Sequence, residues 1–328
     1  MPAIKVENLT KTFNGNFNAV DHIFFAVEEG ELFGLLGPNG AGKTTAINML
    51  TTLLKPTSGY AEVAGHDIVK ERDAVRNDIG IVFQETALDN RLTGFENLEF
   101  HSVMYSMEKE ERRERINEVL DIVELSDKAD LLVDKYSGGM KRRLEIARGL
   151  IHRPKVLFLD EPSLGLDTQT RRHIWDYIVK LNREKVTVVL TTHYMEEADY
   201  LCGRVAIVDH GKIVAMDTPK NLKDSLGGDV VSIESAGDGP ASFEGLRGHE
   251  WVKGIDRHDG ILDLKVSSAD KHLPEIFSVA EKSGIVINSI NVRKPSLEDV
   301  FLRYTGKTIR ESEASQAERM KAHARRRR

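Results

Sequence analysis

The sequence is poor in cysteine and has no long apolar run. Cys202 is the only cysteine among the 328 residues, so no disulfide can form within the chain, and we expect a reducing, cytoplasmic compartment. The N-terminal stretch MPAIKVENLTK has no apolar h-region, so we expect no signal peptide. No apolar run approaches the roughly 18 residues that a membrane-spanning helix needs. If the protein serves a membrane, another chain must supply the spanning part.

The chain also lacks a strong charge imbalance. Its 46 Lys and Arg residues face 52 Asp and Glu residues, which gives a net charge of −6. Such mild acidity argues against nucleic-acid binding through bulk positive charge, and we expect no nucleic-acid partner. Hydrophobic residues make up 40% of the chain, enough for a real core, and the length exceeds what one ordinary domain needs.

Strand and helix patterns alternate over residues 1–217. The apolar stretches ELFGLL and KVLFLDEP are typical of buried strands, and a helical pattern follows each. This alternation predicts an α/β core with a mostly parallel sheet. The segment from about 88 to 150 is charged and amphipathic, which predicts a helical subdomain inserted into that core.

The pattern changes after residue 217. Strand-like stretches such as VVSIESA and ILDLKVS alternate with helical ones, which predicts a small α+β domain over 218–305 with GDGPASFEG (237–245) as a loop. Residues 306–328 are polar and end in four arginines, Arg325–Arg328. We expect this tail to be mobile or only partly helical, and more readily solvated than bound to anionic lipid.

A phosphate-binding loop is the strongest motif. GPNGAGKTT matches G-x-x-x-x-G-K-[ST] after a strand and before a helix. Its glycines allow the backbone N–H groups to face phosphate oxygens. Lys43 is predicted to reach the terminal phosphates, and the Thr44 hydroxyl to ligate Mg²⁺.

Three further strand ends carry polar groups. Asp160 closes the buried strand VLFLD and could hold Mg²⁺ through water, while Glu161 could orient or deprotonate an attacking water. The alternative for both is a solvated strand-end acid. Gln84 and His193 also end strands, and the strand of His193 is expected beside that of Asp160. Together these residues are predicted to surround one phosphate.

The stretch YSGGM suggests a second phosphate-binding helix start. Ser137 is a good N-cap, and Gly138 and Gly139 leave backbone N–H groups bare at the positive end of a helix dipole. The alternative is a plain capped helix. The basic run Lys141–Arg143 that follows is more readily interpreted as solvated surface than as positive potential near phosphates.

The order of these motifs, with SLGLD added, resembles the ATPase subunit of an ABC transporter over about residues 1–217. The resemblance implies an ABC-type P-loop NTPase core, with ATP and Mg²⁺ as cofactors. It implies that Phe13 stacks on adenine, that Gln84 senses Mg²⁺ and couples to a membrane subunit, and that Glu161 is the general base. Asp160 would support Mg²⁺, and His193 would contact the γ-phosphate. The phosphates and Mg²⁺ would be held by Gly37, Pro38, Asn39, Gly40, Ala41, Gly42, Lys43, Thr44 and Thr45.

The resemblance also implies two partners: a second ATPase subunit, expected to be another copy of this chain, and an integral membrane permease at the cytoplasmic face. In a head-to-tail dimer, Ser137, Gly138 and Gly139 would close over the partner's ATP, and Asp167 would lie in the loop that crosses between subunits. The sequence departs from the common signature LSGGQ at Tyr136 and Met140, and from the usual adenine-stacking Tyr at Phe13.

The signature and the C-terminal PSLEDVFLRYTG resemble the daunorubicin and multidrug-resistance exporter branch, with drug or lipid as the favoured cargo. The alternative is a non-transport ABC-type ATPase that acts as a regulatory or nucleic-acid-associated module. Repair relatives carry long coiled coils or zinc cysteines, and translation relatives usually carry two ATPase units. This sequence has none of these features.

Overall fold

The computed structural model describes residues 2–236, 246, 248–258, 261–282 and 286–307, and they divide into two compact units on either side of Asp217 and Thr218. The expected loop at 237–245 and the tail beyond residue 307 lie outside the described residues. Among the residues that are described, no helix is long and apolar enough to cross a bilayer.

The first unit is built on a six-stranded sheet. Five of its strands run parallel and only β10 is antiparallel, which confirms the expected mostly parallel sheet. The central strands are buried along their whole length, as their continuous apolar runs predicted. In spatial order the strands are β10 (Lys212–Asp217), β9 (Arg204–Asp209), β3 (Leu32–Leu36), β8 (Thr187–Thr192), β7 (Val156–Asp160) and β6 (Ile79–Val82).

A separate antiparallel sheet carries the N-terminal strands, which the sequence pattern did not separate from the main core. In spatial order it contains β2 (Phe17–Glu28), β1 (Pro2–Phe13), β4 (Ser58–Val63) and β5 (His66–Asp67). Its apolar face packs with the helix after the phosphate loop and with one face of the main sheet, where Phe25 and Phe33 stack at 5.3 Å between ring centroids. This shared core fixes the antiparallel sheet beside the phosphate loop.

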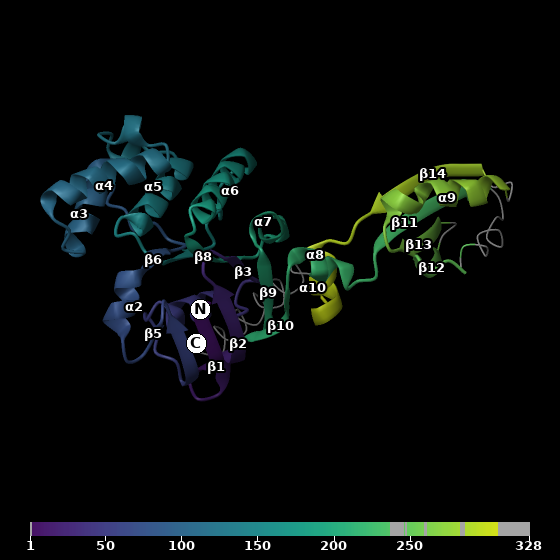
Figure 1. The fold of residues 1–328 in the computed structure, drawn as a ribbon, viewed down its shortest axis with the longest axis horizontal. Coiled ribbons are helices and arrows are strands. Elements are labelled where there is room, and N and C mark those ends of the chain that lie inside the picture. Colours follow the sequence, from purple (N-terminus) through teal and green to yellow (C-terminus); the bar gives the residue numbers. More distant parts are fainter. Residues whose placement is uncertain (1, 237–245, 247, 259–260, 283–285, 308–328) are drawn as a thin grey trace, which may run out of the picture. The chain divides into compact units, whose positions relative to one another are not determined.

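The helices of the first unit are α1 (Lys43–Leu50), α2 (Arg72–Asp78), α3 (Gly94–Met104), α4 (Lys109–Ile122), α5 (Gly138–Leu150), α6 (Thr168–Arg183) and α7 (Met195–Leu201). Helices α3, α4 and α5 follow one another between β6 and β7 and lie together beyond the β6 edge of the sheet (Figure 1). Side-chain caps begin several of them: Thr93 and Glu96 form a capping box on α3, and Asp167 caps α6.

The second unit is a four-stranded antiparallel sheet covered by a helix (Figure 1). Its apolar core joins the sheet to α9, whereas α8 and α10 pack against each other. The strand β12 and the helix α8 did not stand out in the sequence. The elements are α8 (Pro219–Asp224), β11 (Asp229–Ala236), β12 (Val252–His258), β13 (Ile261–Val266), α9 (Ala269–Lys282), β14 (Val286–Arg293) and α10 (Leu297–Thr305).

Candidate nucleotide-binding site

A cavity of about 570 Å³ opens beside the carboxyl ends of β7 and β8 and the start of α1. The carboxyl ends of adjacent parallel strands meet at one edge of a sheet, which is why residues far apart in sequence converge here. The cavity is lined by Phe13, Phe17, Ala19, Asn39, Gly40, Gly42, Lys43, Thr44, Thr45, Gln84, Glu161, Leu164 and His193. Most side chains that the sequence suggested for one phosphate site therefore share one cavity.

The phosphate loop depends on glycine at two positions. Gly40 and Gly42 have φ values of 77° and 107°, in the left-handed region that favours glycine. A Cβ on Gly42 would also lie 2.2 Å from the carbonyl oxygen of Ala19 on β2. The loop can therefore curl at the start of α1 only because Gly40 and Gly42 have no side chain.

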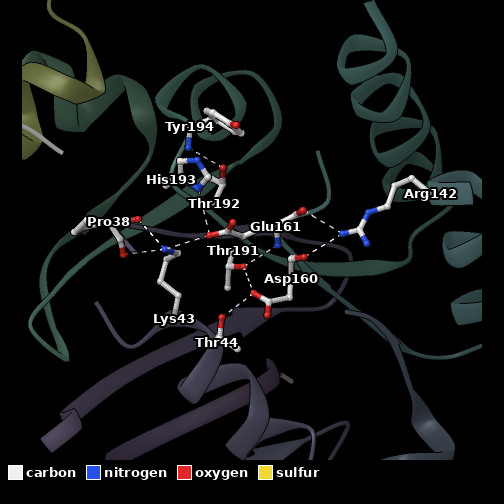
Figure 2. Close-up of polar contacts among 11 residues, drawn as sticks. Pro38, Lys43, Thr44, Arg142, Asp160, Glu161, Thr191, Thr192, His193 and Tyr194 are labelled. Carbon is white, nitrogen blue, oxygen red and sulfur yellow. Dashed lines mark hydrogen bonds and ion pairs between the residues drawn. The ribbon is translucent and has the colours of Figure 1, made fainter. Parts of the chain in front are cut away.

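Lys43 points back over this loop (Figure 2). Its side chain is only 4% exposed, and Nζ donates to the carbonyl oxygens of Gly37 at 2.8 Å and Pro38 at 3.0 Å. The ammonium group is thus held where the loop turns, within 3.6 Å of Glu161 Oε1. A buried cation with oxygen partners on two sides is suited to bind phosphate oxygens.

Thr44 and Asp160 form the candidate metal site. Thr44 Oγ1 lies 3.2 Å from Asp160 Oδ1, and the Thr191 hydroxyl also donates to that carboxylate oxygen. No group of three or more His, Cys, Asp or Glu side chains in the described part of the chain is arranged to hold a metal ion. A hydroxyl and one carboxylate, both hard oxygen donors, fit Mg²⁺, which commonly completes its shell with water and substrate phosphates.

Glu161 follows the end of β7 in an unusual backbone conformation. Its φ is 47°, and its N–H donates to the carbonyl oxygen and the hydroxyl of Thr191, at 3.2 and 3.0 Å. The turn directs the carboxylate toward the phosphate loop, where Oε1 lies 3.6 Å from Lys43 Nζ and 3.2 Å from His193 Nδ1 (Figure 2). The latter pair is close enough for an ion pair, although its alignment does not meet hydrogen-bond geometry.

Burial and two neighbouring side chains, His193 and Lys43, set the ionisation of Glu161. Burial acts to raise the pKa of its carboxyl group, but His193 and Lys43 together outweigh burial and lower that pKa below its usual value. Glu161 is consequently ionised at neutral pH. An ionised carboxylate that faces a phosphate loop can orient a water molecule and accept its proton.

Aromatic side chains form another part of the cavity wall. Phe13 ends β1 and is paired across the hairpin with Phe17, which begins β2, and both line the cavity. Phe17 was not among the residues suggested by the sequence, although the turn signal at Asn14 and Gly15 could have placed it opposite Phe13. The two rings offer apolar surface for a flat ligand group.

The signature lies outside this cavity. Ser137 caps α5 by accepting a hydrogen bond from the Met140 N–H at 3.2 Å, as its position before the helix predicted. A Cβ on Gly139 would lie 2.4 Å from Thr170 Cγ2 on α6, whereas one on Gly138 would meet only Leu166 Cδ2, at 3.7 Å. Gly139 therefore has a packing role within the chain that Gly138 does not share.

Two other residues of this region take part in contacts within the chain. Asp167 lies outside the cavity and accepts hydrogen bonds from the N–H and hydroxyl of Thr170, at 3.0 and 2.6 Å. Tyr136 is buried, and its hydroxyl donates to the carbonyl oxygen of Lys128 at 2.8 Å. Gly94 leaves room for that hydroxyl, because a Cβ there would lie 2.2 Å from it.

The interpretation of the basic run as solvated surface was wrong for Arg142. This side chain is 9% exposed, and its guanidinium donates to four backbone carbonyls between the helical block and the main sheet. Helical spacing gave a signal, because Arg142 lies on the same face of α5 as the buried Ile146 and Leu150. Cys202 is buried as well, and burial raises the pKa of its thiol well above the ordinary value.

Comparison with protein families gives two matches. Residues 20–164 match the ABC transporter family, and residues 218–305 match the family described as ATP-binding protein DrrA1-3-like, C-terminal domain. The linearmycin resistance ATP-binding protein LnrL of Bacillus subtilis is 39% identical over 94% of this chain and 100% of the relative. The daunorubicin resistance ATP-binding protein DrrA2 of Streptomyces coeruleorubidus is 40% identical over 96% of this chain and 98% of the relative.

Solved structures that resemble this chain cover about two thirds of it. The structure of cbiO1 from Clostridium perfringens, part of the ABC transporter complex cbiONQ, has a TM-score of 0.64 and 28% identity, covering 69% of this chain and 92% of that chain. A dimeric ATP-binding cassette in a post-hydrolysis state, bound to ADP and Pi, has a TM-score of 0.59 and 32% identity. The match covers 66% of this chain and 98% of that chain.

Proposed function

Because the chain belongs to the family of ABC transporter ATP-binding proteins and is an ATPase, we propose that it powers export through a separate membrane permease by ATP-driven, head-to-tail dimerisation. The observation that carries the proposal is the position of Glu161. Its ionised carboxylate lies between Lys43 and His193 in the cavity that the phosphate loop lines. A carboxylate in this position can orient or deprotonate the water that attacks the terminal phosphate.

In this proposal ATP occupies the cavity. Phe13 stacks on the adenine, and the backbone N–H groups of residues 37–45 hold the phosphates. Lys43 exchanges its contacts with the carbonyls of Gly37 and Pro38 for contacts with phosphate oxygens. Mg²⁺, held through Thr44, Asp160 and Gln84, would neutralise charge on the phosphate oxygens.

Hydrolysis then depends on the chain's own groups. Glu161 accepts a proton from the attacking water as the water oxygen bonds to the γ-phosphorus. The bond between that phosphorus and the oxygen bridging to the β-phosphate breaks, and ADP and inorganic phosphate leave. His193 contacts the γ-phosphate, and Gln84 reports the presence of Mg²⁺ and water to the permease.

The location of the signature supports the proposed dimer. Ser137, Gly138 and Gly139 begin α5 outside the cavity of their own chain, where they would be free to bind the ATP of a second copy. Asp167, in the loop before α6, crosses between the two subunits. ATP contacts that exist only in the closed dimer shift the permease between its two orientations.

We also propose how the chain is organised into domains. Residues 1–217 form the ATPase domain with its inserted helical subdomain at about 88–150, and residues 218–305 form an accessory domain, in keeping with their separate family match. Relatives named for linearmycin and daunorubicin resistance support a drug as the exported cargo, with a lipid as the other candidate. The ATPase would then work at the cytoplasmic face of the membrane, held there by its permease.

The solution mass of Glu161→Gln, measured with and without Mg·ATP, tests this function. Loss of the base should leave ATP bound and unhydrolysed, so ATP should convert monomer to dimer. Glu184→Gln, an exposed glutamate after α6, is the control and should hydrolyse ATP normally. A monomer that holds ATP would contradict pairing with a second copy, and failure to bind ATP would contradict the cavity assignment.

A further inference from the structure

Arg142 is a buried cation that the proposed mechanism does not use. It lies on α5, five residues after the signature Ser137. Its Nη1 donates to the Phe83 carbonyl at 2.5 Å and its Nε to the Pro162 carbonyl at 2.7 Å. Its Nη2 donates to the carbonyls of Asp160 and Glu161 at 3.0 and 3.2 Å, as Figure 2 shows. One guanidinium thus joins four carbonyls from two separate strand ends.

Each of these carbonyls adjoins a group that the mechanism needs. The Phe83 carbonyl belongs to the peptide bond that leads into Gln84. The other three are successive carbonyls at the end of β7 and in the turn that follows it, where Glu161 adopts its φ of 47°. That conformation is costly for a residue with a side chain and persists only where surrounding contacts hold it. The guanidinium supplies such contacts on the far side of the turn from the carboxylate.

Only arginine offers enough donors in a suitable arrangement. Its planar fork carries five N–H groups in fixed directions, whereas a lysine ammonium presents three on a flexible stem. Burial lowers the pKa of the Arg142 guanidinium below its ordinary value, while the carboxylates of Glu145, Asp160 and Glu197 act in the opposite direction.

The same helix holds the segment after Gln84 at two further points. The Glu145 carboxylate, which is fully buried, accepts a hydrogen bond from the Ala87 N–H at 2.5 Å. Lys141 Nζ donates to Asn90 Oδ1 at 3.0 Å. Helix α5 therefore contacts both ends of the Gln84 segment, and Arg142 connects that segment to the turn that contains Glu161.

We propose that Arg142 is a positioning residue that fixes Glu161 and Gln84 relative to each other and to the signature helix. This inference rests on the proposed role of Glu161 as the general base. None of the four carbonyls belongs to the phosphate loop, so the loss of Arg142 should disturb the chemical step and spare nucleotide binding. A shift of about 1 Å in a reacting group costs about 100-fold in rate.

The test compares Arg142→Gln and Arg142→Lys with Arg143→Gln in the full chain. Arg143 is a matched control because it lies on the same helix and donates to the Val123 and Glu124 carbonyls, away from the cavity. We expect Arg142→Gln to lower kcat by about 10- to 100-fold while KM for ATP changes less than about threefold. Arg142→Lys should lower kcat less, and Arg143→Gln should leave both constants near those of the unmodified chain.

The outcomes separate this inference from the proposed function. If the unmodified chain binds ATP but does not hydrolyse it, the proposed function fails. If the chain hydrolyses ATP and Arg142→Gln has no larger effect than Arg143→Gln, or if KM rises in step with the loss of kcat, the positioning role is overturned. Should the Gln variant not fold, Arg142→Lys decides, because an unchanged kcat in that variant would also overturn it.

Discussion

Two helix starts in this protein are suited to bind phosphate, and they differ in what surrounds them. Helix α1 begins at Gly42 without a side-chain cap, within a cavity that also contains Lys43, Glu161 and His193. Helix α5 begins with its Ser137 cap, and its first turn lies outside that cavity. The first site therefore has a cation and a base within reach, whereas the second offers a helix dipole and backbone donors.

This difference suggests separate roles for the two helix starts in binding and cleaving a phosphate ester. A site with its own cation and base can bind and cleave a phosphate ester within one chain. A site with backbone donors alone gains most when another molecule brings the cation and the base, which is why the proposed dimer pairs the two sites. The comparison can be tested by damaging each site separately.

The largest effect is expected at the first site. Lys43→Ala should weaken ATP binding by about 100-fold or more, because truncating one partner of a buried charge pair costs about 2–5 kcal/mol. Equilibrium binding of ATP measures the loss. Lys155→Ala, whose exposed ammonium pairs with Asp78 at 2.9 Å, is the control and should bind ATP normally. Unchanged binding by Lys43→Ala would remove the distinction between the two sites.

At the second site, the two glycines should respond differently. Gly139→Ala places a methyl group 2.4 Å from Thr170 Cγ2 and should destabilise the nucleotide-free protein by about 1–3 kcal/mol. Gly138→Ala has room within the chain, so its stability should be kept while ATP-driven dimerisation weakens by about tenfold. Thermal unfolding and solution mass in the Glu161→Gln background measure the two effects. Normal dimerisation of Gly138→Ala would argue against a phosphate role for the signature.

The Ser137 cap should show a smaller, double effect. Ser137→Ala removes the oxygen that accepts from the Met140 N–H and should cost about 1 kcal/mol of unfolding free energy. Thr93→Ala removes the comparable cap of α3, a hydroxyl that accepts a hydrogen bond from the Glu96 N–H at 3.1 Å, and should cost a similar amount. Only the Ser137 variant should also lose ATPase activity. Equal loss of activity in both variants would reduce Ser137 to an ordinary cap.

The smallest effect concerns the pH dependence of the first site. Burial acts to raise the pKa of Glu161, and His193 and Lys43 lower it. Without His193 that pKa should rise, so the base becomes protonated at a higher pH and the acid limb of the kcat profile should move upward. His193→Ala is compared with His173→Ala, whose exposed ring lies on α6. An unmoved acid limb would show that His193 does not influence the base.

The order of motifs predicted more of the fold than the composition did. Parallel strands that end in polar groups placed His193 beside Glu161, and the pairing of β7 with β8 confirms that neighbourhood. The burial of Arg142 was not predicted, because a basic residue between two other basic residues usually lies on a solvated surface. The one contrary signal was its position on the same face of the helix as buried apolar residues. Phe17 was not predicted as a site residue, because its place opposite Phe13 depends on the hairpin turn between them.

Local patterns in the sequence were enough to predict the available chemistry: the glycine loop with Lys43 and Thr44, the acidic pair at the end of one buried strand, and the Ser-Gly-Gly helix start. Each lies within a few consecutive residues, so local backbone geometry suffices to form it. The 3.6 Å separation of Lys43 and Glu161 and the meeting of four carbonyls at Arg142 depend instead on how the chain packs in three dimensions. Such contacts join residues that lie far apart in the sequence, 118 positions apart for Lys43 and Glu161, and they depend on strand order and packing, which no local pattern encodes.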